Sequence, residues 1–70
     1  MNSYLRTIAE TETMNGLEKV TEGSRKMFYK MYSPDDANKP LYDIIAELDD
    51  DDLDNAMDQV MRTIEKHGSI

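Results

Sequence analysis

The sequence predicts an all-α protein, a small bundle of three or four short helices in one domain that spans residues 1–70. Two observations predict this fold. Apolar residues recur every three or four positions along much of the chain, as they do on one face of a helix. Neither flank of the turn signal Asn15-Gly16 alternates with the two-residue period of a half-buried strand. We expect helices near residues 3–13, 17–32, 40–48 and 51–67.

The clearest helix is the last one. Its apolar stripe is formed by Leu53, Met57, Val60 and Ile64, and it is widened by Ala56 and Met61. Asp49 or Asp50 caps the start, and the acids that follow lie where the exposed N–H groups favour negative charge. Cations gather at the other end, and Gly68 provides the stop. The gathered cations are Arg62, Lys66 and His67.

The N-terminal half divides at Asn15-Gly16, a dipeptide typical of a turn or a helix end. Ser3 caps the helix before this point, and Asn15 with Glu18 forms a variant capping box for the helix after it. The stripe of the second helix consists of Leu17, Val20, Ser24, Met27, Phe28 and Met31. A single helix over residues 3–32 competes with this division, although each internal Gly costs about 0.5–1 kcal/mol relative to Ala.

The middle of the chain contains two prolines, which limit where helices can run. Ser33-Pro34 predicts one short turn over residues 34–37, and Pro40 then starts a new helix because its ring would disrupt a continuing one. The apolar face of that helix consists of Leu41, Ile44, Ile45 and Leu48. The alternative is one bent helix over residues 40–67, because the aspartates at 49–52 do not forbid continuation.

We expect the main packing contact to be antiparallel, between the helices at 17–32 and 51–67, with the helix at 40–48 lying across them. This arrangement predicts which side chains form the core. The expected core is Leu17, Val20, Met27, Phe28, Met31, Leu41, Ile44, Ile45, Leu48, Leu53, Met57, Val60 and Ile64.

Length and composition restrict the function. The chain has 70 residues, one His and no Cys, which excludes disulfides and argues against zinc sites. A chain of this size buries only about 60% of its unfolded surface, so a protein partner or a second copy is the expected supplement. No segment is apolar enough to span a bilayer, and the first residues lack the apolar region of a signal peptide. We therefore expect a cytoplasmic protein, located in the host cytoplasm if it is viral.

Charge is distributed unevenly along the chain. Residues 1–32 carry five basic and four acidic side chains, whereas residues 33–70 carry three basic and eleven acidic ones, for a total of −7. This total argues against direct binding of nucleic acid or of an anionic membrane. Either the two halves attract each other within the fold, or an acidic face is displayed to a partner with a basic surface.

The acidic run does not match a metal site or an active site. Starting an EF-hand loop at Asp50 places Asn55 where the loop requires Gly and Met61 where it requires Glu. The chain also lacks a phosphate-binding Gly-rich loop and a nucleophile elbow. We expect no catalytic residue, no cofactor and no metal.

Two groups of side chains are candidates for partner binding. One is a set of carboxylates on the third and fourth predicted helices. The other is the outer side of the cation- and aromatic-rich segment 25–32, whose composition also suits stacking and phosphate contact. The candidate residues are Asp43, Glu47, Asp51, Asp54, Asp58, Tyr29 and Tyr32.

The expected function is that of a small, acidic, non-enzymatic module that docks onto a larger protein or assembly. In size, charge and lack of Cys the chain resembles the small acidic phage proteins that occlude nucleic-acid-binding sites. This resemblance implies an alternative, a nucleic-acid mimic that inhibits a host enzyme. A further alternative is a structural or accessory subunit of a virion-like assembly.

Overall fold

The computed structural model describes residues 1–67, and over that range it contains helices and no strand, which confirms the predicted all-α fold. The molecule is flat, with dimensions of 31 × 28 × 16 Å along its principal axes. The four helices are α1 (Ser3–Lys19), α2 (Glu22–Tyr32), α3 (Leu41–Glu47) and α4 (Asp50–His67).

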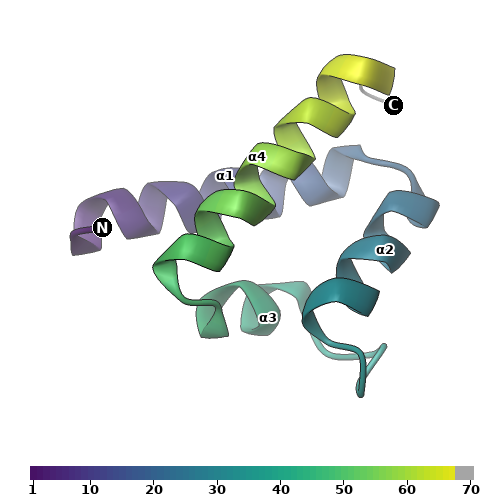
Figure 1. Ribbon diagram of the computed structural model, residues 1–70, viewed down its shortest axis with the longest axis horizontal. Coiled ribbons are helices and arrows are strands. Elements are labelled where there is room, and N and C mark those ends of the chain that lie inside the picture. Colours follow the sequence, from purple (N-terminus) through teal and green to yellow (C-terminus); the bar gives the residue numbers. More distant parts are fainter. Residues whose placement is uncertain (68–70) are drawn as a thin grey trace.

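The main packing contact joins α1 and α4, which cross at the centre of the molecule, while α3 packs against α1 (Figure 1). Arg6 bonds to Asp50 near the start of both helices, and Gly16 meets Val60 further along them, so the helices run in the same general direction. The predicted antiparallel contact between residues 17–32 and 51–67 is therefore wrong. Figure 1 shows α2 to one side of the crossing.

The crossing explains why α1 does not end at Asn15-Gly16. A Cβ atom at position 16 would collide with Cγ1 of Val60 and would lie 3.6 Å from Cδ1 of Ile64. Gly16 is buried inside a continuous helix, where the missing side chain lets α4 approach closely. The predicted division into helices 3–13 and 17–32 is wrong, and Asn15 caps nothing because it lies within α1.

The break between α1 and α2 instead falls at Val20-Thr21. Val20 adopts an extended backbone conformation, and the Thr21 hydroxyl caps α2 by accepting a hydrogen bond from the Ser24 N–H at 3.2 Å. Nη1 of Arg25 donates to the carbonyl oxygens of Leu17 and Val20 at 3.1 and 2.9 Å, which satisfies the end of α1. The single helix over residues 3–32 is thus also wrong.

The other helix ends follow local chemistry more closely. The carboxylate of Asp49 accepts from the Asp52 N–H at 2.7 Å, which confirms the first of the two caps predicted for α4. Asn2, not Ser3, caps α1, because its side-chain oxygen accepts from the Leu5 N–H at 2.8 Å. Residues 48–49 separate α3 from α4, so the single bent helix over 40–67 is wrong. The stop predicted at Gly68 lies outside the described residues.

The core lies between α1, α3 and α4, with one aromatic side chain from α2. Its buried members are Ala9, Thr13, Leu17, Val20, Phe28, Ile44, Ile45, Leu53, Ala56 and Val60. Four more predicted core residues are half-buried against it: Leu41, Leu48, Met57 and Ile64.

Two of the predicted core residues are not buried. Met27 and Met31 are exposed, because α2 does not lay its apolar stripe flat on α4. Ala9 and Thr13 take part in their place, since α1 occupies the central position. The buried Thr13 hydroxyl is satisfied by donating to the carbonyl oxygen of Ala9 at 2.7 Å.

Candidate functional site

The predicted acidic candidates lie on two helices. Asp43 and Glu47 belong to α3, whereas Asp51, Asp54 and Asp58 belong to α4, and all five are exposed. Helical periodicity places the three α4 carboxylates on the side of the helix that faces away from its buried stripe. They form what we call the α4 acidic face (Asp51, Asp54 and Asp58), which takes no part in the core.

Ion pairs reduce the charge that these candidates present. Within residues 1–67, Glu47 pairs with Lys39, and Asp58 pairs with Nε of Arg62 at 3.0 Å. The hydrogen bond from Lys39 to Glu47 is also the main cause of the raised pKa of Lys39. Among residues 1–67, Asp51 and Asp54 are the carboxylates of the α4 acidic face that form no ion pair.

Asp50 has a structural role that its place in the acidic run does not reveal. Its carboxylate accepts from the N-terminal ammonium of Met1 at 2.6 Å and from Nη1 of Arg6 at 2.9 Å. These two hydrogen bonds lower the pKa of Asp50, and the bond from the ammonium is the larger of the two causes. The positive N-terminal segment and the acidic C-terminal segment therefore attract each other within the fold at this point.

Arg6 extends this contact to the end of α3. Its Nη2 donates to the carbonyl oxygens of Ile45 and Ala46 at 3.3 and 3.2 Å, and also to that of Leu48. These carbonyls belong to the last turn and the cap of a short helix, where backbone acceptors lack the usual partner of the next turn. The carbonyl oxygen of Ile45 also accepts from the Leu48 N–H at 3.3 Å. One guanidinium thus joins three helices, a role that sequence reasoning missed because a single Arg carries no spacing signal.

The two candidate tyrosines are less free than predicted. Tyr29 donates its hydroxyl proton to the carbonyl oxygen of Lys39 at 2.7 Å. The ring of Tyr32 packs against Phe28, with ring centroids 4.9 Å apart. Burial is the largest cause of the raised pKa of the Tyr32 hydroxyl, and the negative charge of Asp52 is the next. Both side chains are half-buried, so neither projects freely toward a partner.

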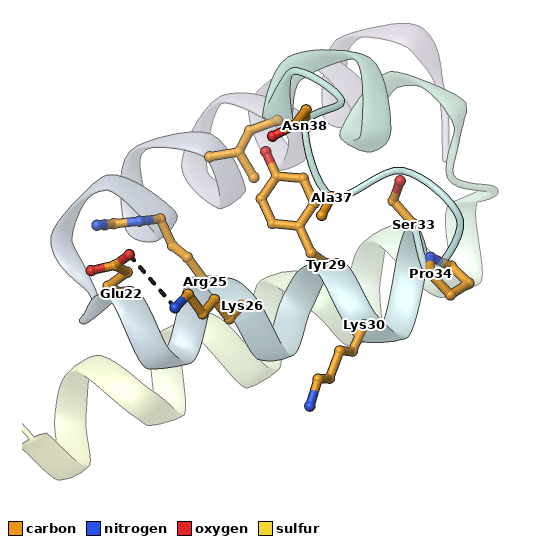
Figure 2. A pocket seen from close by; sticks show the side chains of 10 residues that line it. Glu22, Arg25, Lys26, Tyr29, Lys30, Ser33, Pro34, Ala37 and Asn38 are labelled. Atoms are coloured by element: carbon orange, nitrogen blue, oxygen red, sulfur yellow. Dashed lines mark ion pairs between the residues drawn. The ribbon is translucent and has the colours of Figure 1, made fainter.

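A cavity of about 680 Å³ opens between α2 and the segment that leads into α3; we call it the α2 groove. Figure 2 shows the Tyr29 ring between α2 and the segment that carries Ala37 and Asn38. Cations on α2 line the cavity together with apolar side chains. Its lining residues are Glu22, Arg25, Lys26, Tyr29, Lys30, Ser33, Pro34, Ala37, Asn38 and Leu41.

A second, smaller cavity of about 110 Å³ lies between α2 and α4; we call it the methionine groove. Phe28 and Val60 form buried parts of its wall, and the exposed Met27 and Met31 stand beside them. Its lining residues are Leu17, Val20, Ser24, Met27, Phe28, Met31, Ala56, Gln59, Val60 and Thr63. The apolar stripe of α2 is therefore only partly covered by the fold.

Among the residues that the structure describes, neither a metal-ion cluster nor a membrane-spanning helix is found. No group of three or more His, Cys, Asp or Glu side chains is arranged to hold a metal ion among these residues. No helix among them is both long and apolar enough to cross a membrane. Comparisons with protein-family models, with curated proteins and with solved structures found no match to this chain.

Proposed function

We propose that this chain is a small, non-enzymatic protein-binding module that docks onto a larger protein or assembly through the methionine groove. The observation that supports this proposal is the exposure of Met27 and Met31, at 59% and 49%, beside a partly covered apolar groove. Burying a side chain of this kind contributes about 1.5–3 kcal/mol. Flexible thioethers also adapt their shape to the surface that covers them.

The partner that fits this groove is an apolar ridge, such as one face of an amphipathic helix. The groove is small, at about 110 Å³, and its wall at Phe28 and Val60 is already buried within the fold. Gln59 and Thr63 on the α4 side offer hydrogen-bonding groups at the edge. An apolar centre with polar groups at its border is the usual composition of a protein–protein interface.

The test replaces both methionines with charged residues. The double variant Met27→Glu/Met31→Glu is expected to fold, because both side chains are exposed, and to lose the partner captured by the wild-type protein from cells that make it. The matched control is Tyr42→Glu, which charges an exposed aromatic side chain that does not line the groove. Capture of the same partner by the double variant and the wild type would refute this docking site.

A nucleic-acid mimic is the second candidate, and the α4 acidic face supports it. Asp51, Asp54 and Asp58 repeat along the exposed side of one helix, as phosphates repeat along a strand. Under this alternative, the triple variant with Asn at all three positions keeps its fold but no longer competes with a labelled DNA duplex for the captured partner. Undiminished competition by the triple variant would reject the mimic. Salt sensitivity separates the two functions, since screening weakens exposed charge pairs far more than apolar contacts.

A further inference from the structure

The α2 groove is a cationic site on a chain whose net charge is −7. Arg25, Lys26 and Lys30 line it together with one acidic side chain, that of Glu22. The pairing of Lys26 with Glu22 is long, at 3.8 Å, and both side chains are about three-quarters exposed. Such a pair is worth little, so a better-placed carboxylate can replace Glu22 at low cost.

The apolar part of the α2 groove is formed by Tyr29 and Leu41, and contacts within the fold hold it in position. The hydrogen bond from the Tyr29 hydroxyl to Lys39 fixes the ring against the segment that leads into α3, and Leu41 lies beside it. The volume of about 680 Å³ falls within the range of roughly 300–1,000 Å³ that ligand pockets occupy. The groove therefore combines an apolar surface with cations at its border.

The segment opposite α2 is held by its own hydrogen bonds. The N–H of Ser33 donates to the carbonyl oxygen of Tyr29 at 2.7 Å, and its hydroxyl donates to that of Asp36 at 2.8 Å. The carboxylate of Asp36 in turn accepts from the Asn38 N–H at 3.0 Å. A ligand entering the α2 groove thus meets an ordered loop, which lowers the entropic cost of binding.

From these features we infer that the α2 groove binds an acidic peptide segment of a partner protein. A carboxylate of the peptide lies between Lys26 and Lys30, and a neighbouring aromatic or aliphatic side chain packs on Tyr29 and Leu41. Because α2 carries the two grooves on opposite sides, this inference does not rest on the methionine groove.

Charge decides between a peptide and a nucleic acid as the occupant. A nucleic acid carries one negative charge per nucleotide over a long surface, and a chain of net charge −7 repels it beyond the short positive patch. A peptide with one or two carboxylates meets only the local charges, because salt screens the others beyond about 8–10 Å. The apolar surface of the groove also contributes more binding free energy with an apolar side chain than with a phosphate group.

The test is a titration of the isotope-labelled protein with a blocked Glu-Phe-Glu tripeptide, followed by the amide signals of residues 22–41. We expect saturable shifts in this segment. A Gln-Phe-Gln peptide and a Glu-Ala-Glu peptide are each expected to bind more weakly, by about tenfold for the uncharged one. The variant Lys26→Gln/Lys30→Gln is expected to lose about tenfold in affinity for Glu-Phe-Glu.

The control variant Lys19→Gln/Lys66→Gln removes the same charge from two exposed lysines that do not line the groove, and should bind as the wild type does. An equal loss in this control, absence of saturable shifts, or tighter binding of an oligothymidylate than of the peptide would each overturn the inference. The variant Met27→Glu/Met31→Glu should still bind the peptide, so failure here is distinguishable from failure of the proposed function.

Discussion

The α1–α4 crossing and α2 represent two ways in which this short chain uses a helix. At the crossing, Gly16 lets the backbones approach until Val60 fills the space, and the side chains around it are buried. On α2, Phe28 alone is buried, and a groove runs along each side of the helix. The comparison indicates that stability is concentrated in the crossing, and that α2 has surface available for binding.

The largest expected effect comes from truncating a core side chain at the crossing. Leu53 is fully buried, so Leu53→Ala is expected to destabilise the protein by about 2–5 kcal/mol, through lost burial and the cavity left behind. Met27→Ala is the matched truncation on α2 and should change stability by about 0.5 kcal/mol or less. Urea unfolding followed by circular dichroism measures both. Similar losses for the two variants would show that α2 contributes to the core as the crossing does.

Two glycine substitutions test the close approach of the backbones directly. Gly16→Ala adds a methyl group that collides with Val60, so overpacking of about 1–3 kcal/mol exceeds the gain in helix propensity of about 0.5–1 kcal/mol. Gly23→Ala meets only the Thr21 hydroxyl at 3.9 Å, an ordinary contact, and should stabilise α2 by up to about 1 kcal/mol. The two changes in melting temperature are expected to have opposite signs. A stabilising Gly16→Ala would contradict the tight crossing.

The corner between α1 and α2, at Val20-Thr21, depends on Arg25. Arg25→Met keeps most of the aliphatic stem but leaves the carbonyl oxygens of Leu17 and Val20 without their donor, at an expected cost of about 1–2 kcal/mol. Hydrogen exchange should then accelerate at the end of α1 and the start of α2, but not at Leu53. Unchanged exchange at the corner would mean that the Thr21 cap is sufficient by itself.

The difference between local and long-range contacts explains which features the sequence was able to predict. The start of α4 follows from Asp49 and the acids after it, because capping is decided within one turn of the chain. The role of Gly16 depends on Val60, which is distant in sequence, so local reasoning assigned the glycine to a turn. The exposure of Met27 and Met31 was missed for a related reason, since an apolar stripe does not reveal which helix covers it.

The candidate site on α2 was predictable in part: the sequence separates the two sides of the helix but does not indicate the groove. Helical periodicity correctly separates Met27, Phe28 and Met31 from the cationic side of α2. The α2 groove also needs the fold of residues 33–39, which is set by the hydrogen bonds of Ser33 and Asp36 and by Tyr29 reaching Lys39. The bonds of Ser33 and Asp36 are local turn contacts that span three and two residues, whereas the bond from Tyr29 to Lys39 spans ten residues and no spacing in the sequence indicates it.

The smallest expected effect concerns pH and the start of the crossing. The pKa of Asp50 is lowered from its ordinary value of 3.8, so the carboxylate contributes stability that is complete above that value and is lost as pH falls through the lower folded pKa. Asp50→Asn should therefore be less stable than the wild type near neutral pH, and the difference should shrink in acid.

Urea midpoints measured from about pH 7 down to about pH 2 test this dependence. The effect is small because nearly half of the Asp50 side chain is exposed and salt screens it. Asp54→Asn removes an exposed carboxylate from the same helix and serves as the control. A difference between the wild type and Asp50→Asn that stayed constant in acid would assign the stabilisation to packing of the Arg6 side chain, independent of charge.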